Sequence, residues 1–349
     1  MTAHASPVRR TLLALAKIAL AVAILAYLLH QAREHDAFTQ LVEQPKRWDL
    51  LAGGLACTFL AILLGFVRWH LFIRAVGIPI HLLDSIRLGA LGYALNFVSL
   101  GAVGGDLFKA IFLAHGQPGR RTEAVASVLA DRVAGLMTIL ALATGGILVT
   151  DLTHRAPPPL VALCNAILVA AAVAFCGAAA ALLVPALSGP RILALAHRLP
   201  IVGSTIARLL GAVATYRHQK RALLVAGAVS IAVNLAYITA FYLVASGLPI
   251  KRPSYAEHFV VVPVANMVGA IPATPSGVGT KEAAVDLLYR TMPSGTGVVK
   301  GVGTMVTLAH RLAEMTGALL GFLYYLSHRK EVEEVYHEAE EIEEEGELP

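Results

Sequence analysis

Charged residues are scarce in this sequence of 349 residues. Asp, Glu, Lys and Arg make up 15% of the chain, against roughly 25% in an ordinary soluble protein. Apolar residues make up 57%, and the mean hydropathy is +0.68. A core of ordinary size cannot hide so much apolar surface, so lipid must solvate part of it. The composition excludes a chain of soluble domains and predicts an all-α, polytopic integral membrane protein.

Cysteine and the common catalytic motifs are also rare or missing. The three cysteines, Cys57, Cys164 and Cys176, lie in apolar stretches, and none has CxxC or zinc-finger spacing. The sequence contains no GxSxG, P-loop, HExxH or dinucleotide fingerprint. No basic run is interleaved with aromatic residues, which argues against a nucleic-acid partner. We therefore expect no metal, no cofactor and no catalytic residues.

Acidic residues are unevenly distributed. Ten of the 23 acids lie in the last 19 residues, and the rest of the chain holds 28 basic and 13 acidic residues. A basic balance on the hydrophobic part suits contact with an anionic membrane surface. We expect residues 1–328 to form a single transmembrane domain and residues 329–349 to form a solvated, acidic cytoplasmic tail.

Six apolar stretches are long enough to span a bilayer as helices, which takes about 20 residues. The first follows two arginines and resembles a signal peptide, but it lacks a small-residue cleavage site, so we interpret it as an uncleaved span. The segment 188–221 is amphipathic and basic, as expected of a linker on the membrane surface. The predicted spans are Leu12–Leu29, Leu50–Val67, Val133–Thr150, Pro159–Leu187, Ala222–Ile250 and Gly301–Ser327.

Basic residues in the loops predict the orientation. Segment 188–221 carries six Arg or Lys residues, so the positive-inside rule places it in the cytoplasm. Counting spans from there places Arg68 and Arg74 in a cytoplasmic loop, 151–158 outside, and both termini in the cytoplasm.

Two further apolar stretches are broken by Gly, Pro, Ser and Asn. The stretch from Arg87 to Arg120 begins and ends inside, and the stretch from Tyr255 to Gly297 begins and ends outside, so each must cross an even number of times. About ten helical residues reach the midplane. The sequence therefore predicts two re-entrant hairpins of opposite direction, with tips at Ser99–Asp106 and Pro272–Glu282.

The two hairpins share landmarks whose spacing drifts slowly from 170 to 179 residues. We interpret them as an inverted-topology repeat covering about 50–150 and 222–327, with coincidence as the alternative. Inverted repeats with broken helices are typical of secondary transporters. The matches are Gly77-Ile78-Pro79-Ile80 with Gly247-Leu248-Pro249-Ile250, Asn96 with Asn266, Gly101 and Asp106 with Gly277 and Glu282, and Asp131-Arg132 with His310-Arg311.

Nine charged or titratable residues fall at membrane depth, where each is costly and suggests a function. One interpretation is a polar cavity whose cations and hairpin helix N-termini bind a phosphate, while its acids bind an amine or carry a proton. The other is that the charges pair and lock each hairpin to a helix. They are Asp106, Lys109, Asp131 and Arg132 in the first copy, and Lys281, Glu282, His310, Arg311 and Glu314 in the second.

The dyads Asp131-Arg132 and His310-Arg311 give the sharpest hypothesis. They occupy equivalent places after each hairpin, so we expect them to face each other and gate the cavity, with Asp131 pairing with Arg311 in one state. Histidine titrates near neutral pH, which suggests proton coupling through His310 with Glu314 as its partner. The alternative is that His310 only donates a hydrogen bond to a neighbouring helix.

Glycines near the hairpin tips either present backbone N–H groups to a ligand or let the two arms pack closely. With the charges and two asparagines, they complete the predicted substrate and translocation site. That site comprises Asn96, Gly104, Gly105, Asp106, Lys109, Asp131, Arg132, Asn266, Pro275, Gly277, Gly279, Lys281, Glu282, His310, Arg311 and Glu314.

The segments NFVSLGAVGGDLFKA, SVLADRVAGL and ANMVGAIPATPSGVGTKEAA carry a family resemblance. Over about residues 10–328 the chain resembles the lysylphosphatidylglycerol synthase transmembrane (flippase-like) family, which includes the membrane half of the bacterial multiple peptide resistance factor and hopanoid-associated transport proteins. The resemblance implies a bacterial or archaeal plasma-membrane protein that moves a lipid headgroup between leaflets. By matching motif, it implies roles for Gly104, Gly105, Asp106, Arg132, Pro275, Gly277, Gly279 and Glu282.

One departure from that family limits the chemistry we expect. The synthase needs a large cytosolic aminoacyl-transferase domain, and here only the acidic tail follows Lys330, so lipid aminoacylation is not expected. The leading hypothesis is a translocase for a phosphate-containing lipid or other amphiphile. The alternatives are a membrane-embedded transferase with a lipid or polyprenyl-phosphate donor, and a non-transporting scaffold for a lipid-synthesis enzyme. The expected partners are a membrane lipid or lipid-linked amphiphile and, for the scaffold, that enzyme.

Overall fold

The structure is a computed structural model, and it describes residues 19–30, 43–98, 104–115, 120–184, 211, 215–271 and 273–327. Within these ranges the chain folds into helices joined by turns, with no β-strand. The prediction of an all-α protein is confirmed. Most of the predicted linker 188–221, the first hairpin tip up to residue 103, and the whole acidic tail lie outside the described residues.

In the part of the chain that the structure describes, four helices are long and apolar enough to cross a membrane: α3 (Trp48–Ala75), α6 (Arg121–Thr150), α8 (Pro158–Leu183) and α11 (Lys220–Gly247). At 1.5 Å per residue, the 28 residues of α3 reach about 42 Å, more than the hydrocarbon core of a bilayer. Large apolar side chains remain exposed along α8, among them Val169, Val173 and Leu183. The chain is a multi-pass helical membrane protein.

The other two predicted spans are less complete. Of the predicted span Leu12–Leu29, the described part begins at residue 19, in the apolar helix Ala19–His30. The last predicted span corresponds to α14 (Val302–Ser327), a helix of 26 residues with charged groups in its middle. Six spans therefore remain a prediction, and four meet the requirement by length and composition.

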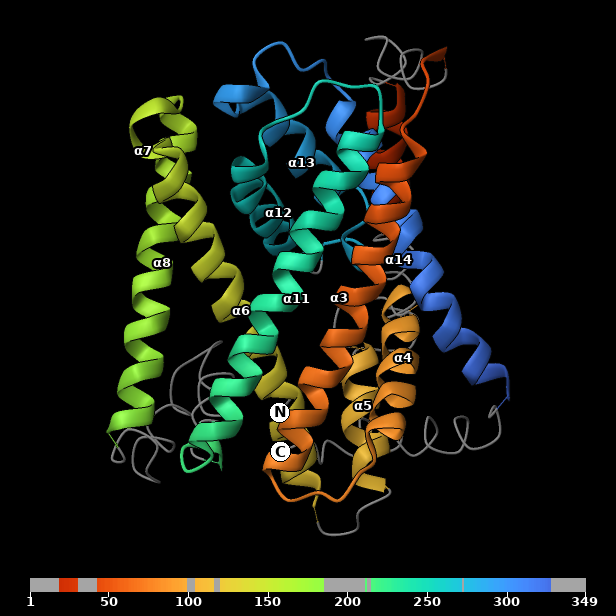
Figure 1. Cartoon of the computed structure of the whole chain (residues 1–349), viewed down its shortest axis with the longest axis vertical. Helices are drawn as coiled ribbons and strands as arrows, with labels where there is room; N and C mark the ends of the chain where they lie inside the picture. The colour runs from red at the N-terminus through yellow and green to blue at the C-terminus, as the bar shows by residue number, and fades with distance from the viewer. Residues whose placement is uncertain are drawn as a thin grey trace, which may run out of the picture.

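Two helical hairpins lie at opposite ends of the long helices. α4 (Leu82–Val98) and α5 (Gly104–His115) form the first, and α12 (Tyr255–Ala270) and α13 (Thr280–Thr291) form the second. Figure 1 shows α4 and α5 low beside α3, and α12 and α13 high beside α11. The short helices η2 (Pro275–Gly277), η3 (Pro293–Gly295) and α7 (Leu152–Arg155) connect the larger elements.

Local sequence signals set several helix ends. Ser254 and Glu257 form a capping box at the start of α12, which satisfies two backbone N–H groups there. Pro158 occupies the first turn of α8, where its missing N–H costs nothing. Asp151, which follows α6, has a left-handed backbone with φ of 53° and ends that helix.

The packing of the two halves matches element by element. α3 packs along α11 at the centre of the molecule. α4 packs on α14, and α12 packs on α6, so each hairpin's first helix crosses to the opposite half. α5 then contacts α6 as α13 contacts α14. Under the predicted repeat, each contact in one half has a counterpart in the other, and the C-terminal end of α4 lies against η2.

Glycine permits the close approach within each hairpin. A Cβ on Gly105 would lie 2.0 Å from the carbonyl oxygen of Gly92, and a Cβ on Gly277 would lie 2.4 Å from the carbonyl oxygen of Gly269. Gly277 also has a φ of +64°, which L side chains rarely adopt. At these two positions the structure favours close packing of the arms over presentation of N–H groups to a ligand.

Candidate functional site

A polar cavity lies where the two hairpins meet the long helices. Its main part has a volume of about 570 Å³, and an adjoining part has about 280 Å³. α3, α4, α5, α6, α11, α12 and α14 contribute side chains to the main part, and α13 adds to the adjoining part. The two parts share Tyr93, Asn96, Arg132, Tyr237, Asn266, Ala270 and Glu314.

Asp106 anchors the first half of the cavity from the first turn of α5. It accepts a short charge-assisted hydrogen bond from Arg132 of α6, and Lys109 Nζ lies 3.4 Å from its Oδ1. One carboxylate therefore serves two cations. The Asp106 side chain is buried, whereas 52% of the Arg132 side chain remains exposed. Arg132 is consequently open to an anion from the cavity.

Glu282 and Arg311 make the equivalent pair in the second half. Glu282 lies in the first turn of α13 with a fully buried side chain, and its Oε1 is 2.9 Å from Arg311 Nε. Its other oxygen accepts the Gly279 N–H at 2.7 Å. The Arg311 side chain is only 12% exposed, and its Nη2 is buried without a hydrogen-bond partner among the described residues. The equivalent arginines therefore differ in exposure. We call the half-exposed Arg132 the open arginine and the buried Arg311 the closed arginine.

Asp131 pairs with Arg68, so the pair predicted between Asp131 and Arg311 in one state is not formed here. Arg68 Nε and Nη2 donate to the two carboxylate oxygens of Asp131 at 2.7 and 3.1 Å. Placing Arg68 in a cytoplasmic loop was wrong, because α3 continues to Ala75 and buries Arg68. The apolar run ends before Arg68, but the salt bridge neutralises the charge and lets the helix continue.

Tyr237, Lys281, His310 and Glu314 form a second buried group, which we term the Glu314 cluster. Tyr237 donates to Glu314 Oε1 at 2.5 Å, and Lys281 Nζ donates to the Tyr237 hydroxyl oxygen at 2.7 Å. Lys281 Nζ is 3.5 Å and His310 Nδ1 is 3.7 Å from the same Glu314 oxygen. Three members of the cluster line the cavity, and His310 lies behind them.

The hairpin tips close the adjoining part of the cavity. Asn96 accepts the Gly105 N–H at its Oδ1, 3.1 Å away. Its backbone carbonyl accepts a hydrogen bond from Ser276 Oγ at 2.6 Å, which links α4 to η2. Arg311 Nη1 lies 3.4 Å from the Ser276 carbonyl oxygen. The N–H groups of Gly105 and Gly279 are both used inside the hairpins and do not face a ligand.

The structure brings most of the predicted polar residues to one cavity. Asn96, Asp106, Lys109, Asp131, Arg132, Asn266, Lys281, Arg311 and Glu314 line it. Gly104 begins α5, while Gly105, Pro275, Gly277, Gly279 and Glu282 build the hairpin turns behind the lining. His310 is buried away from the cavity, so the two dyads do not face each other as whole units.

Sequence reasoning missed five lining residues. Arg68, Tyr93, Asn234, Tyr237 and Ser276 all contribute polar groups to the cavity. Arg68 could have been found, since it directly follows the uninterrupted apolar run Leu50–Val67, but it was assigned to a loop. Tyrosine and asparagine inside apolar helices are too common to identify a site without knowing which face of the helix they occupy.

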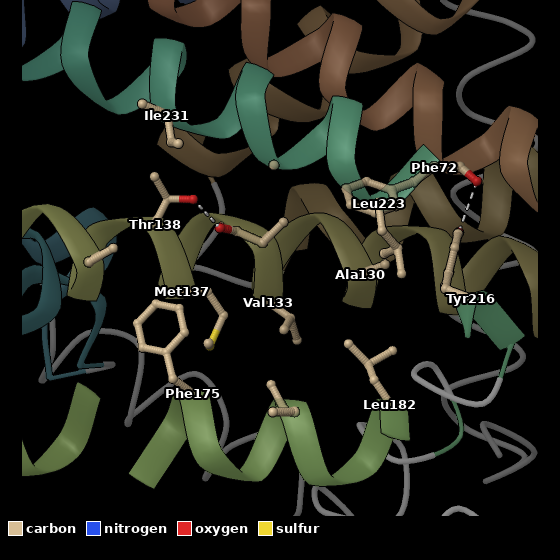
Figure 2. A pocket seen from close by; sticks show the side chains of 15 residues that line it. Phe72, Ala130, Val133, Met137, Thr138, Phe175, Leu182, Tyr216, Leu223 and Ile231 are labelled. Carbon is tan, nitrogen blue, oxygen red and sulfur yellow. Dashed lines mark hydrogen bonds between the residues drawn. The ribbon is translucent and has the colours of Figure 1, made fainter. Parts of the chain in front are cut away.

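A second pocket of about 500 Å³ lies on the other side of α6. Figure 2 shows Val133 and Met137 of α6 opposite Phe175 and Leu182 of α8. The Tyr216 hydroxyl donates to the Phe72 carbonyl at 2.9 Å, and Thr138 donates to Ala134 at 2.8 Å. None of the described residues that line this pocket is charged. α6 therefore separates an apolar pocket from the polar cavity.

Among the described residues, no group of three or more His, Cys, Asp or Glu side chains is arranged to hold a metal ion. A model of the family described as "Lysylphosphatidylglycerol synthase TM region" matches residues 14–321. No curated protein and no solved structure matches the chain. The matched range includes every residue that lines the polar cavity, and it links this membrane protein to lipid metabolism.

Proposed function

The chain belongs to the lysylphosphatidylglycerol synthase TM region family, and we propose that it moves a phosphate-containing lipid between the two leaflets of a cell membrane. The headgroup enters the polar cavity, while the hydrocarbon tails stay in the lipid phase. Because the headgroup is only carried, its chemistry is unchanged. The lining residues supply charge and hydrogen bonds, and these replace the water that the headgroup loses.

The half-exposed guanidinium of Arg132 is the observation that carries this proposal. Its side chain is 52% exposed, although Asp106, the acid that it shares with Lys109, is buried. A phosphodiester that enters the cavity can therefore reach this guanidinium. A guanidinium binds phosphate oxygens through two parallel, charge-assisted hydrogen bonds, which offset the cost of bringing the negative charge to membrane depth.

The second half supports the same assignment. Arg311 lines the adjoining part of the cavity with Arg132, and its Nη2 lacks a hydrogen-bond partner among the described side chains and backbone groups. Because Arg132 is open and Arg311 closed, we propose that the phosphate first meets Arg132. If the two halves then exchanged conformations, Arg132 would become buried and Arg311 would become exposed towards the other leaflet, as expected of an inverted repeat.

The proposed orientation follows the basic residues at the end of the molecule where α3 ends and α6 begins. Arg74, Arg87, Arg120, Arg121 and Lys220 cluster there, and we propose that this end faces the cytoplasm. The α4–α5 hairpin then enters from the cytoplasm and the α12–α13 hairpin enters from outside. Both termini are cytoplasmic in this arrangement, and the membrane is the plasma membrane of a bacterium or archaeon.

Reconstitution tests the proposal. The purified chain is placed in vesicles of phosphatidylethanolamine and phosphatidylglycerol that carry fluorescent phosphatidylglycerol in both leaflets. A membrane-impermeant reductant quenches about half of the fluorescence in protein-free vesicles, because only the outer leaflet is accessible. We expect nearly complete quenching with the protein, and an unchanged lipid mass.

Arg132→Gln is the decisive variant, and Arg155→Gln is its matched control. Arg132 is half exposed, so its loss leaves the fold intact while removing the proposed phosphate ligand. Arg155 lies in α7 with an exposed side chain paired to Asp151, away from the cavity. We expect Arg132→Gln to return quenching to the protein-free level and Arg155→Gln to behave as wild type. Quenching that never exceeds the protein-free level contradicts translocation, and a changed lipid mass favours a transferase.

A further inference from the structure

His310 is the least satisfied polar side chain of the described structure. It lies in the middle of α14, it is 0% exposed, and its ring centroid is 5.0 Å from those of both Tyr237 and Phe241. Neither ring nitrogen has a hydrogen-bond partner among the described residues. Natural proteins rarely leave buried polar atoms unpaired, and the exceptions are often groups that transfer protons or bind water.

An acid lies just beyond hydrogen-bonding distance of this ring. His310 Nδ1 is 3.7 Å from Glu314 Oε1, one helical turn further along α14. That oxygen also accepts from the Tyr237 hydroxyl, which in turn accepts from Lys281. Because Lys281 and Glu314 both line the cavity, the Glu314 cluster connects a buried histidine to the proposed headgroup path.

The groups around His310 come from five helices. Phe241 shields the ring on one side, and behind it lies His258, whose two nitrogens are already occupied by the Ser254 carbonyl and the Tyr289 hydroxyl. Glu282 is neutralised by Arg311. Lys281 is thus the cation that compensates Glu314. The titratable and charged groups are, by helix, Tyr93 of α4, Tyr237 of α11, His258 of α12, Lys281, Glu282 and Tyr289 of α13, and Arg311 and Glu314 of α14.

The equivalent positions of the first half hold no such pair. Under the repeat, His310 corresponds to Asp131 and Glu314 corresponds to Gly135. Asp131 is held by two hydrogen bonds from Arg68, and Gly135 has no ionisable group. The acid–arginine pairs are duplicated, whereas the histidine–glutamate pair occurs once. A role in locking hairpin to helix accounts for the duplicated pairs but not for the single one.

We propose that the Glu314 cluster takes up one proton for each anionic headgroup that enters the cavity, so that lipid movement is coupled to proton movement. This rests on the proposed translocation. When a phosphodiester enters, Lys281 turns from Glu314 to the phosphate oxygens. Glu314 then lacks its cation, and an uncompensated buried carboxylate is stabilised by protonation.

The proton transfer balances in two steps. A hydronium ion or buffer acid that enters the cavity donates a proton to the Glu314 carboxylate, which lines it, and the conjugate base of the donor returns to bulk solution. Glu314 then passes the proton from Oε1 to His310 Nδ1, which leaves an imidazolium beside the carboxylate in place of the Lys281 ammonium. The headgroup brings one negative charge and the proton one positive charge, so the occupied cavity carries the same net charge as the empty one. Because the net charge of the cavity does not change, moving the headgroup through a medium of low dielectric constant takes less free energy.

Two measurements test the coupling separately from translocation. The first uses the vesicle assay between about pH 5 and about pH 8, the range in which histidine titrates. Wild type should move fluorescent phosphatidylglycerol at a pH-dependent rate, and Glu314→Gln, which has nearly the shape of the protonated acid, should lose that dependence. The matched control, His154→Gln, changes an exposed histidine of α7 and should keep the wild-type profile.

The second measurement follows protons directly. A pH-indicator dye in weakly buffered detergent solution reports proton uptake when short-chain phosphatidylglycerol is added to the purified protein. We expect about one proton per protein for wild type and none for Glu314→Gln or His310→Gln. Lipid movement with an unaltered pH profile in Glu314→Gln overturns the coupling and leaves translocation standing. Proton uptake without lipid movement at any pH supports protonation of the Glu314 cluster on lipid binding and contradicts translocation.

Discussion

The Ser276 side chain donates a 2.6 Å hydrogen bond to the backbone carbonyl of Asn96. These residues are 180 positions apart in sequence, yet the bond joins the end of α4 to η2, so it links two hairpins that approach from opposite ends of the molecule. Both residues line the adjoining part of the cavity. We expect a movement that buries Arg132 and exposes Arg311 to break this contact, because it ties the two hairpins together beside both arginines.

Two substitutions at Ser276 separate the hydrogen bond from the backbone. Ser276 has a φ of 49°, which is unfavourable for residues other than glycine. Ser276→Ala removes the bond and keeps the strain, so it should lower the free energy of unfolding by about 1 kcal/mol. Ser276→Gly removes both the hydrogen bond and the backbone strain, so it should lower the free energy of unfolding by less than Ser276→Ala does. Thermal unfolding in detergent measures which of the two variants is more stable. If the glycine variant is the less stable one, the backbone at Ser276 is not strained.

Removing the acid from each arginine pair should have unequal effects. Glu282→Gln leaves Arg311 buried with an uncompensated charge, and breaking such a pair costs about 3–5 kcal/mol. Asp106 also neutralises Lys109, whose side chain is only 13% exposed, so Asp106→Asn is combined with Lys109→Gln to leave Arg132 as the cation that loses its acid. Arg132 is half exposed and better solvated than Arg311, so this double variant should lower the free energy of unfolding by less than Glu282→Gln. Glu282→Gln with Arg311→Gln should regain part of the loss. Unfolding midpoints measure the set, and equal losses for Glu282→Gln and for Asp106→Asn with Lys109→Gln would show that exposure of the arginine does not matter.

Glycine substitutions test the hairpin packing. Gly105→Ala and Gly277→Ala place a Cβ within 2.0 and 2.4 Å of a carbonyl oxygen, so we expect little folded protein from either. Gly145→Ala in α6 is the matched control, because nothing lies within 4 Å of its Cβ position. It should be neutral or stabilise the helix by up to about 1 kcal/mol. Size-exclusion profiles and expression levels report the outcome, and normal folding of Gly105→Ala would contradict the observed contact.

The proposed orientation is tested by labelling single cysteines in intact cells. His154 in α7 and Leu83 at the start of α4 are both exposed and lie at opposite ends of the molecule. A membrane-impermeant maleimide should label His154→Cys and leave Leu83→Cys unlabelled until the cells are opened. The reverse pattern contradicts the orientation.

Local sequence signals predicted much of the fold. The predicted spans around α3, α6, α8 and α11 lacked charges because lipid solvates their side chains, and each apolar run overlaps the observed helix. The broken apolar stretches coincided with the hairpins, since glycine and proline end helices wherever they lie. Boundaries were less accurate. α6 begins twelve residues before the predicted Val133, because Asp131 and Arg132 are stabilised inside the helix by ion pairs.

The candidate site was predicted in its residue types but not in its pairings. Charges at membrane depth pointed to Asp106, Arg132 and Arg311 without any structure. The partner of Asp131 was missed because Arg68 lies 63 residues earlier, on a helix whose rotation the sequence does not reveal. Tyr237 was missed for the same reason.

The sequence by itself determined that the chain is a helical membrane protein with costly charges buried at two equivalent places. Hydrophobicity, glycine and charge are properties of single residues, so their physical consequences can be worked out along the chain. Only the tertiary structure decided that Arg132 is half exposed while Arg311 is buried, and that His310 lies away from the cavity while Glu314 lines it. Exposure and pairing depend on the rotation and register of whole helices, which are set by packing between segments far apart in sequence.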